Sequence, residues 1–487
     1  MTRRRAKLLS RGQDADVLSP RLRFRRAIAL VILSAAAPGS AQVAVGRRLV
    51  GWIGLLLWGA VIGVLVATAW RFRDDRAGLI GMATDSTVLM VARIGLVAFV
   101  VIWLAYLADA FRLAKPFALP AWRAGVVVIL NVALLLGVAG TAAYASQLAG
   151  VQRSVVNEVF AEKEVKQPLE GRYNILLIGS DSGDDRDGIR PDSLTVVSVD
   201  ADDGDAVLIS LPRNLQNVPF REDSPMREIY PYGYNCGGEC LINAVHTEGR
   251  QHPELYPDAD DPGLEATIDA VEGSTDLTIS YYVMVNLRGF ESLVDAVGGV
   301  EIDVPTRLAK FGLEDAWKQE YLEAGKQKLN GEDALWYARS RVQSDDFTRM
   351  GRQKCLMAAM LDQMSPQKVL LNATDIARSS EQLLSTDIPA AELGPFGDLA
   401  LKSRDHSITS VSLVPPEVNV AAPDWDEVHR MIRVAIGEED EPEETTPTPA
   451  ATTEAPSPSI PDQQDDLQEE NRRQAEANNA DDLSETC

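Results

Sequence analysis

Three long apolar runs near the start of the chain limit what this sequence can fold into. They lie at about 49–70, 87–110 and 124–145, and each reaches the roughly 18–20 residues that a helix needs to cross a bilayer. Because a backbone inside lipid must satisfy its own hydrogen bonds, such runs are expected to be α-helices. Residues 49–146 are therefore predicted to form a membrane region with three transmembrane helices.

A weaker apolar run, residues 27–45, contains Pro38 and Gly39 and is interpreted as an interfacial or re-entrant helix. The alternative is a fourth span. Residues 1–48 carry eleven Lys and Arg, and positive charge favours the cytoplasmic side of a membrane. A fourth span would place this basic segment outside, so three spans are preferred. The chain is then a multi-pass cell-membrane protein with everything after the third span outside the cell.

Acidic charge dominates the remainder of the chain. The formal net charge is −24 and the pI is near 4.6, whereas binding to nucleic acid requires a concentrated basic surface. Nucleic acid is therefore not expected as a partner. Residues 438–487 are rich in Glu, Asp, Pro and Thr, and such a composition cannot bury enough apolar surface to fold. This segment is predicted to be a disordered tail.

Between the membrane region and the tail, we expect a stalk at 147–170 and a folded domain at 171–437. Short β-rich runs alternate with amphipathic helical patterns there, which is typical of a layered α-β-α domain. The expected strands are 174–179, 193–200, 205–212, 281–287, 300–305 and 408–415, and the expected helices are 289–299, 329–339, 344–364 and 424–437. The predicted fold class is thus N-terminal transmembrane helices, an extracytoplasmic layered α/β domain and a disordered tail.

The sequence NCGGEC places Cys236 and Cys240 four residues apart. This spacing does not match a zinc knuckle, and no second pair accompanies it. A location outside the cell favours a disulfide between them. Pairing of either cysteine with Cys355 is the alternative.

The segment YARSRVQSDDFTRMGRQ, residues 337–353, concentrates arginines in this acidic chain. Arg349, Arg352 and Gln353 are spaced to share one face of a helix, close to its N-terminus, where unpaired N–H groups favour a bound anion. Several forked guanidiniums around such a site suit a pyrophosphate better than a single carboxylate. Surface ion pairs with nearby carboxylates are the alternative. The predicted pyrophosphate ligands here are Arg339, Arg341, Arg349, Arg352 and Gln353.

A second cluster falls where the first predicted strand ends. Asp181 follows that strand, and Asp192 precedes the next one. Because ligands of α/β sheets gather at strand ends, the two carboxylates are expected at one rim. Two carboxylates together with substrate phosphate oxygens are a usual setting for Mg²⁺. Arg213, in SLPRN, follows another strand and is expected at the same rim.

Seven sequence blocks resemble the signature motifs of the LytR–CpsA–Psr family of cell-wall glycopolymer ligases. They occur in the family's order, from about Asn174 to Gln353, and read NILLIGSD, RPDSLTVVSVD, LISLPRN, INAV, YYVMVNLRGFESLVDAVGGVEIDVP, LNGEDALWYARSR and DDFTRMGRQ. The resemblance implies an enzyme, a phosphotransferase outside the cell membrane. Its donor would be a glycopolymer on a polyprenyl-pyrophosphate lipid, and its acceptor peptidoglycan, to which the polymer is joined through a phosphodiester.

The resemblance also assigns roles to individual residues. Asp181 and Asp192 would hold Mg²⁺, or Mn²⁺ in its place, and Asp346 would act as the base, with Arg339 and Arg341 in the catalytic group. The pyrophosphate ligands implied by matching positions are Arg190, Arg213, Arg339, Arg341, Arg349, Arg352 and Gln353. The polymer implied is arabinogalactan or a teichoic-acid-like chain. Alternatives are a non-catalytic wall sensor or scaffold that binds polyprenyl pyrophosphate, and a lipid pyrophosphatase. Regulation through DNA contact conflicts with the predicted topology and charge.

Overall fold

The computed structural model describes residues 19–73, 78, 82, 86–159, 165–180, 190–238, 240–310, 320–340, 346–363 and 384–439. The chain divides into two compact units, Met1–Ser154 and Val155–Cys487. Of the predicted tail, only residues 438 and 439 fall within the described part.

The first unit is entirely helical in its described part. Within those residues, three helices are long and apolar enough to cross a membrane, Arg48–Arg71, Thr87–Ala118 and Ala121–Thr141. The prediction of three N-terminal apolar helices is thereby confirmed. The elements of this unit are α2 (Pro20–Ala36), α3 (Ser40–Val45), α4 (Arg48–Arg71), α6 (Ser86–Ala114), η2 (Pro116–Ala118) and α7 (Ala121–Val159), which continues into the second unit.

The weaker apolar run folds as two helices, α2 and α3, separated by a turn that contains Pro38 and Gly39. Gly39 has a φ of 95°, and a Cβ there would lie 2.2 Å from the carbonyl oxygen of Gly51 in α4. Only glycine permits this approach, because it tolerates the left-handed region and has no side chain. The buried Gln42 side chain donates to the Asp109 carboxylate of α6 at 3.0 Å. The run is therefore a broken helix packed on α4 and α6.

The second unit is built around a six-stranded mixed sheet with the order β10-β3-β2-β1-β4-β9. Strand β1 pairs antiparallel with β2, which pairs antiparallel with β3, whereas β4 runs parallel to β1 and β10 parallel to β3. The strands are β1 (Arg172–Ser180), β2 (Pro191–Asp200), β3 (Ala206–Leu211), β4 (Tyr281–Asn286), β9 (Leu384–Thr386) and β10 (Thr409–Ser412).

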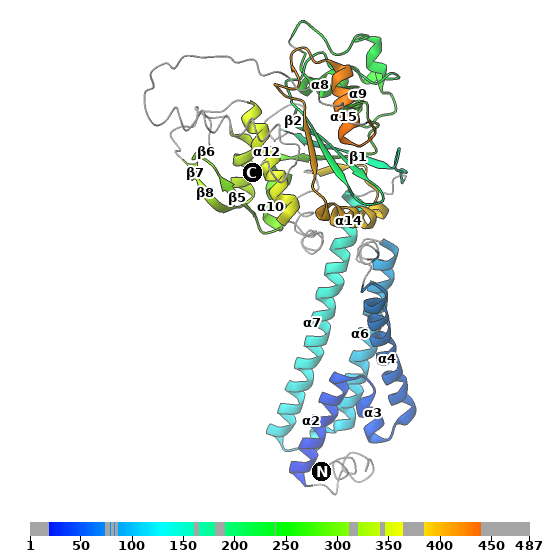
Figure 1. The fold of residues 1–487 in the computed structure, drawn as a ribbon. Coiled ribbons are helices and arrows are strands. Elements are labelled where there is room, and N and C mark those ends of the chain that lie inside the picture. Colours follow the sequence, from blue (N-terminus) through cyan, green and yellow to red (C-terminus); the bar gives the residue numbers. More distant parts are fainter. Residues whose placement is uncertain are drawn as a thin grey trace. The chain divides into compact units, whose positions relative to one another are not determined.

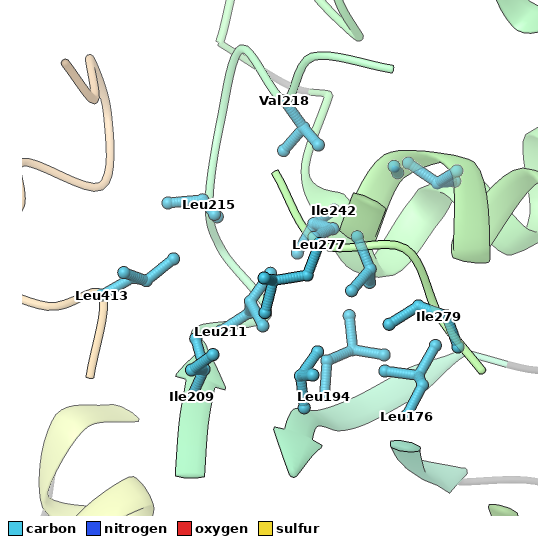
Figure 2. Close-up of a cluster of buried hydrophobic side chains, with 14 of the residues drawn as sticks. Leu176, Leu194, Ile209, Leu211, Leu215, Val218, Ile242, Leu277, Ile279 and Leu413 are labelled. Atoms are coloured by element: carbon cyan, nitrogen blue, oxygen red, sulfur yellow. The ribbon is translucent and has the colours of Figure 1, made fainter. Parts of the chain in front are cut away.

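One face of the sheet carries the main hydrophobic core. Helices α8 (Val245–Gln251), α9 (Pro262–Thr275) and α15 (Trp425–Ala435) cover it (Figure 1). Strands, loops and helices all contribute side chains to this core, as Figure 2 shows for Leu176, Leu194, Ile209, Leu211, Leu215, Val218, Ile242, Leu277, Ile279 and Leu413. The alternation of buried and half-buried residues along β1 directs Leu176 and Ile178 into this core.

The opposite side of the sheet carries a second layer with its own hydrophobic core. Helix α12 lies over β2, β3 and β10, and Phe396 of α14 packs edge-on against Tyr173 and Tyr281. The predicted layered α-β-α architecture is therefore confirmed. The elements of this layer are α10 (Leu287–Ala296), β5 (Val300–Val304), β6 (Leu308–Ala309), β7 (Tyr321–Leu322), β8 (Gly325–Leu329), α11 (Gly331–Arg339), α12 (Asp346–Gln363) and α14 (Leu393–Lys402).

Short 3-10 helices complete the second unit, and helix caps mark several boundaries that the sequence indicates. The Asn330 side chain accepts from the amide of Asp333 at the start of α11, and Asp424 accepts from Glu427 at the start of α15. Such side-chain oxygens satisfy amides that have no partner within the helix. The 3-10 helices are η3 (Pro225–Glu228), η4 (Ile242–Ala244), η5 (Pro253–Leu255), η7 (Ala390–Glu392) and η8 (Ser403–Asp405).

Candidate active site

The central strands bring distant polar residues to one rim of the sheet. Strand β1 ends where β2 begins, because the two are antiparallel, and Asp192 is the second residue of β2. Strand β3 runs back along β2 and ends at Leu211, so Arg213 returns to the same rim. Helix α12 begins with Asp346 at this place. Three segments separated by up to 154 positions in sequence thus meet at one point.

Two guanidiniums and two carboxylates form a continuous cluster at the rim. Arg213 donates through Nη1 to Asp192 Oδ1 at 2.8 Å and through Nε to Asp346 Oδ1 at 3.1 Å. Arg349 donates through Nη2 to Asp346 Oδ2 at 3.1 Å and through Nη1 to the Asp192 carbonyl at 3.3 Å. We call these four residues the rim cluster. Its charges alternate, so each guanidinium contacts both acidic residues.

The rim cluster is partly buried. The Arg349 side chain is 2% exposed, whereas those of Arg213, Asp192 and Asp346 are 24%, 22% and 19% exposed. A guanidinium buried to this extent requires hydrogen-bonded partners, which Arg349 has. Asp346 lies in the first turn of α12, where the positive end of the helix dipole favours a carboxylate. The outer edge of the cluster is accessible to a ligand.

A small cavity of about 30 Å³ adjoins the rim cluster. It lies between the sheet and α12, and both Arg349 and Gln353 reach it from one face of that helix. Its wall combines charged, hydroxyl and apolar side chains: Asp192, Ser193, Leu194, Thr195, Leu208, Ser210, Leu211, Arg213, Arg349, Met350, Gln353, Lys354, Met357 and Ser412. Of these, only Asp192, Arg213, Arg349 and Gln353 were predicted from the sequence. Lys354 could have been found from its helical spacing to Met350 and Met357.

Arg352 has a different environment from Arg349. It is 3% exposed, and its guanidinium donates to the carbonyl of Tyr337 at 3.0 Å and to the carbonyl of Ser340. Gln353 donates from its amide to the carbonyl of Ala338 at 3.2 Å. These bonds fasten the C-terminal end of α11 to α12. The structure thus gives Arg352 a clear role in positioning the segment that leads into the site.

Of the other predicted arginines, Arg339 and Arg190 lie within the described residues and Arg341 does not. Arg339 is the last residue of α11. Burial raises the pKa of the Glu291 carboxyl, and the positive charge of Arg339 offsets part of that rise. Arg190 is exposed just before β2. Burial raises the pKa of the Tyr234 hydroxyl, and the positive charge of Arg190 offsets part of that rise. Arg341 and Asp181, which were also predicted, lie outside the described residues.

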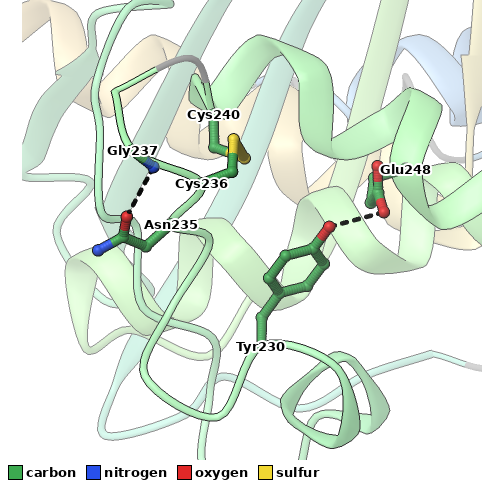
Figure 3. Close-up of a disulfide and its surroundings, with 6 residues drawn as sticks. All are labelled: Tyr230, Asn235, Cys236, Gly237, Cys240 and Glu248. Carbon is green, nitrogen blue, oxygen red and sulfur yellow. Dashed lines mark hydrogen bonds between the residues drawn. A yellow bond between two sulfur atoms is a disulfide. The ribbon is translucent and has the colours of Figure 1, made fainter.

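A disulfide joins Cys236 and Cys240 in a loop next to the rim (Figure 3). The predicted pair is confirmed, and neither cysteine pairs with Cys355. The loop is anchored by β-bridges between Gln216 and Leu241 and between Val218 and Tyr234. The segment that follows Arg213 is thus held against the disulfide loop.

The donor set fits the metal that the resemblance implies. The described residues contain no group of three or more His, Cys, Asp or Glu that could enclose an ion. Mg²⁺ does not require one, because it is commonly held by one or two carboxylates, waters and substrate phosphate oxygens. Asp192 supplies a hard carboxylate at the rim, beside the space open to a ligand. Its chemistry is therefore suitable for Mg²⁺.

The fold and the site together define an α/β domain that follows three helices long and apolar enough to cross a membrane, with paired arginines and carboxylates at one rim of its sheet. The LytR_cpsA_psr family model matches residues 142–430. The chain belongs to this family.

Two relatives of known name are 25% and 29% identical to this chain over the aligned residues. Polyisoprenyl-teichoic acid–peptidoglycan teichoic acid transferase TagV of Bacillus subtilis is 29% identical over 246 residues, covering 50% of this chain and 55% of TagV. The cell wall biosynthesis protein LcpA of Corynebacterium glutamicum is 25% identical over 307 residues, covering 55% of this chain and 56% of LcpA. The chain therefore spans a little over half the length of these two relatives.

Similar folds occur among solved structures. The crystal structure of B. subtilis TagV aligns with 25% identity and a TM-score of 0.40, covering 55% of this chain and 97% of that one. A structure of TagT bound to LIIa-WTA aligns with 19% identity and a TM-score of 0.37, covering 56% of this chain and 94% of that one.

Proposed function

We propose that this protein transfers a glycopolymer from a polyprenyl-pyrophosphate carrier to peptidoglycan, forming a phosphodiester, at the outer face of the cell membrane. The observation that carries this proposal is the rim cluster, with two guanidiniums at the edge of the six-stranded mixed sheet. Membership of the family supports the choice of reaction, and the names of TagV and TagU describe transfer of teichoic acid to peptidoglycan in those proteins. The polymer would be teichoic-acid-like or an arabinogalactan.

In this reaction the rim cluster changes partners. Without a ligand, Arg213 and Arg349 hold the carboxylates of Asp192 and Asp346. When a diphosphate enters, the guanidiniums turn toward its non-bridging oxygens, which is the geometry that phosphoryl transfer uses to disperse charge. Arg339, at the end of α11, would contact the same diphosphate, together with Arg190 and Arg341. Gln353 and Arg352 would support them.

Asp346 is then released to act as a base. Its carboxylate would take the proton of the attacking hydroxyl on the wall polymer as that oxygen bonds to the phosphorus nearer the glycan. The bond from this phosphorus to the bridging oxygen breaks at the same time. The electron pair leaves with polyprenyl phosphate, so that one diphosphate linkage becomes one phosphodiester and one monophosphate.

Asp192, together with Asp181, would hold Mg²⁺ or Mn²⁺ between the rim and the diphosphate. A bound divalent ion supplies positive charge to the phosphoryl oxygens in the transition state. Asp192 would have to exchange its contact with Arg213 for the ion, which is consistent with a guanidinium that moves to the phosphate.

Attachment to the membrane would favour a donor that is anchored in the same bilayer. Three apolar helices and a basic N-terminal segment favour a cytoplasmic N-terminus and an outer catalytic domain. We propose the division 1–48 cytoplasmic, 49–146 membrane, 147–170 stalk, 171–437 catalytic domain and 438–487 tail. Membrane attachment limits the search for a donor that is itself anchored in the bilayer.

The test is a transfer assay with the full-length protein in nanodiscs, a lipid-linked glycan donor, Mg²⁺ and peptidoglycan fragments. Mass spectrometry should find the glycan joined to peptidoglycan through a phosphodiester, together with polyprenyl phosphate. Release of the glycan phosphate to water alone would identify a lipid pyrophosphatase instead. Binding of the donor without turnover, across metals and acceptors, would identify a wall sensor or scaffold and refute the proposal.

A further inference from the structure

One tyrosine in the second unit is far more exposed than any comparable side chain described there. Tyr232 is 93% exposed. The other exposed large apolar side chains in the described part of this unit are 39–46% exposed: Val165, Leu169, Ile229, Tyr321 and Leu361. Single apolar residues on a surface are common, so exposure alone assigns no role to Tyr232. The chain around it, however, holds its ring in a fixed place.

A tight turn carries Tyr232 at its tip. The Gly233 amide donates to the Tyr230 carbonyl at 3.1 Å, which closes a turn in which Pro231 restricts the backbone just before Tyr232. Gly233 has a φ of 90°, and a Cβ there would lie 2.8 Å from the carbonyl oxygen of Val218. Only glycine fits such a position. We call residues 230–233 the tyrosine turn.

Both ends of the tyrosine turn are fastened to the domain. The Tyr230 hydroxyl donates to the Glu248 carboxylate at 2.7 Å (Figure 3), and the Tyr230 ring meets the Tyr234 ring edge-on with centroids 5.0 Å apart. The disulfide between Cys236 and Cys240 closes the loop that follows. Because the turn is ordered before a ligand arrives, binding to it costs little conformational entropy.

The tyrosine turn lies a short way along the chain from the rim cluster. Tyr234 forms a β-bridge with Val218, and Val218 follows Arg213 by five positions, which a chain spans in no more than about 18 Å. Beyond the disulfide, the Asn243 amide donates to the Arg213 carbonyl at 3.3 Å. The distance between the turn and Arg213 is therefore one that a few linked sugars can bridge.

The composition of this segment suits an uncharged ligand. Residues 229–238 read IYPYGYNCGG and contain no charged side chain, although 24% of the chain's residues are charged. Tyr, Gly and Asn are typical of recognition loops, because they combine rigid contact area with adaptable hydrogen bonding. The Asn235 Oδ1 accepts from the Gly237 amide at 3.2 Å, and its Nδ2 points away from the loop (Figure 3). An anionic lipid surface would instead require basic side chains.

We propose that the tyrosine turn binds the glycan strand of the acceptor, with the Tyr232 ring stacked on the C–H face of an N-acetylated pyranose. This inference rests on the proposed transfer to peptidoglycan and extends it to recognition of the acceptor. The face of an aromatic ring is electron-rich and attracts the weakly positive C–H groups of a sugar. The Asn235 amide donates to an acetamido or hydroxyl oxygen of the same strand.

The small size of this surface favours a sugar over a second protein molecule. A stable protein interface buries about 800 Å² on each partner. Here Tyr232 is accompanied by one further exposed large apolar side chain close to it in sequence, Ile229, which is 42% exposed. Such an area matches one or two sugar rings, and a glycan strand gains strength by contacting the rim as well.

The experiment measures binding of chitotetraose, an uncharged N-acetylglucosamine oligomer, to the full-length protein in nanodiscs. Saturation-transfer NMR suits weak sugar binding to a large particle and identifies which sugar protons touch the protein; empty nanodiscs provide the blank. The variants are Tyr232→Ala, Tyr232→Phe and Tyr232→Trp. The matched control is Tyr321→Ala, because Tyr321 is also exposed but the Arg307 guanidinium covers its ring, 3.8 Å from the centroid.

We expect Tyr232→Ala to weaken chitotetraose binding by about five- to tenfold, the effect of losing one aromatic stacking contact. Tyr232→Phe and Tyr232→Trp should stay within about twofold of the wild type, because they keep an aromatic face. The C–H protons on one face of the pyranose should receive most of the saturation. In the transfer assay, Tyr232→Ala should raise the KM for peptidoglycan fragments and leave kcat and the KM for the donor unchanged, as expected for uniform binding.

Four outcomes would overturn the inference: no binding of chitotetraose to the wild type, unchanged binding in Tyr232→Ala, an equal loss in Tyr321→Ala, or a loss of self-association in Tyr232→Ala. The last result would identify a second copy of the chain as the occupant. The transfer function is judged separately. If sugar binding depends on Tyr232 but no glycan reaches peptidoglycan, the sugar site stands and the proposed reaction fails. If transfer proceeds with an unchanged acceptor KM in Tyr232→Ala, the reaction stands and the sugar site fails.

Discussion

Arg213 should contribute to stability mainly through its bridge between two carboxylates. Its guanidinium lies 2.8 Å from Asp192 Oδ1 and 3.1 Å from Asp346 Oδ1. Two unit charges about 4 Å apart interact by about 4 kcal/mol at an effective dielectric constant of roughly 20. Desolvation and side-chain entropy oppose most of this, so exposed pairs contribute about 0.2–1 kcal/mol, whereas breaking a fully buried pair costs about 3–5 kcal/mol.

The rim cluster lies between these limits, because about a fifth to a quarter of each of the three side chains is exposed. We therefore expect Arg213→Gln to lower the free energy of unfolding by about 2 kcal/mol. The change also leaves Asp192 and Asp346 as neighbouring like charges without the guanidinium that bridges their carboxylates. The Asp346→Asn change should partly relieve this repulsion, so the double variant should lose about 1 kcal/mol less than the two single losses together.

The assay is a double-mutant cycle on the second unit expressed alone, unfolded by urea and followed by circular dichroism. The control pair is Arg430 and Glu427 of α15, whose side chains are 40% and 44% exposed. Its coupling should stay below about 0.5 kcal/mol. Additivity of Arg213→Gln and Asp346→Asn within about 0.3 kcal/mol would refute the reasoning, since it would mean that the bridge contributes no more than solvent contacts do.

Other expectations concern catalysis, the disulfide and pH. Asp346→Asn should reduce transfer by about 10²–10⁴-fold while donor binding persists, as measured by single-turnover kinetics, because it removes the base and preserves the shape; an unchanged rate would exclude that role. Replacing Cys236 and Cys240 by Ser should lower the free energy of unfolding by about 2 kcal/mol in urea titrations, the chain-entropy value for so short a loop; an unchanged midpoint would contradict this. Asp261 caps the N-terminus of α9, and the His246 imidazole, 3.4 Å from its carboxylate, holds the pKa of Asp261 below its usual range. The stabilisation is therefore present above the unfolded value of about 3.9 and is lost as pH falls through the folded pKa. Asp261→Asn, which keeps a capping side chain, should lower the free energy of unfolding by about 1 kcal/mol near pH 7 and match the wild type in strong acid; a constant difference across pH would contradict this linkage.

The strands and helices that carry strong local signals could be predicted from the sequence. The apolar runs of β1 to β4 are bounded by turn residues, and Asn330 and Asp424 cap the helices that they precede. The rim position of Asp192 also followed from strand ends alone. These features depend on neighbours in sequence, so no knowledge of distant contacts was needed.

Helix α9 could not be recognised in the same way. Its buried side carries Asp269 and Glu272, which interrupt the apolar periodicity that marks a helix. Their partners come from other segments: Ser224 donates to Asp269 at 2.6 Å, Tyr256 donates to it at 2.5 Å, and Arg221 contacts both acidic residues. A buried carboxylate is stable only with such partners. Nothing in the local pattern shows that they are available.

The site shows the same division between local and distant information. Helical spacing correctly grouped Arg349 with Gln353 on one face of α12. It also grouped Arg352 with them, because spacing alone does not reveal that α11 ends against α12. The carbonyls of Tyr337 and Ser340 accept from Arg352, and they come from a helix end whose position depends on tertiary packing. The grouping of Thr195, Ser210 and Ser412 was missed for a related reason. These residues become neighbours only when β2, β3 and β10 pair.

The charges of the rim cluster explain why a site for a polyanion needs more cations than the cluster holds. Arg213 and Arg349 are balanced by Asp192 and Asp346 at the same rim, so the cluster by itself is close to neutral. A diphosphate diester adds two negative charges that must be matched in a partly desolvated place. In the proposed reaction, Asp192 would turn to a divalent ion and Asp346 would accept a proton, so both guanidiniums would become available to the phosphates. The carboxylates would then hold the arginines in place until a donor binds, and exchange of partners, rather than a standing excess of positive charge, would make such a site compatible with an acidic chain.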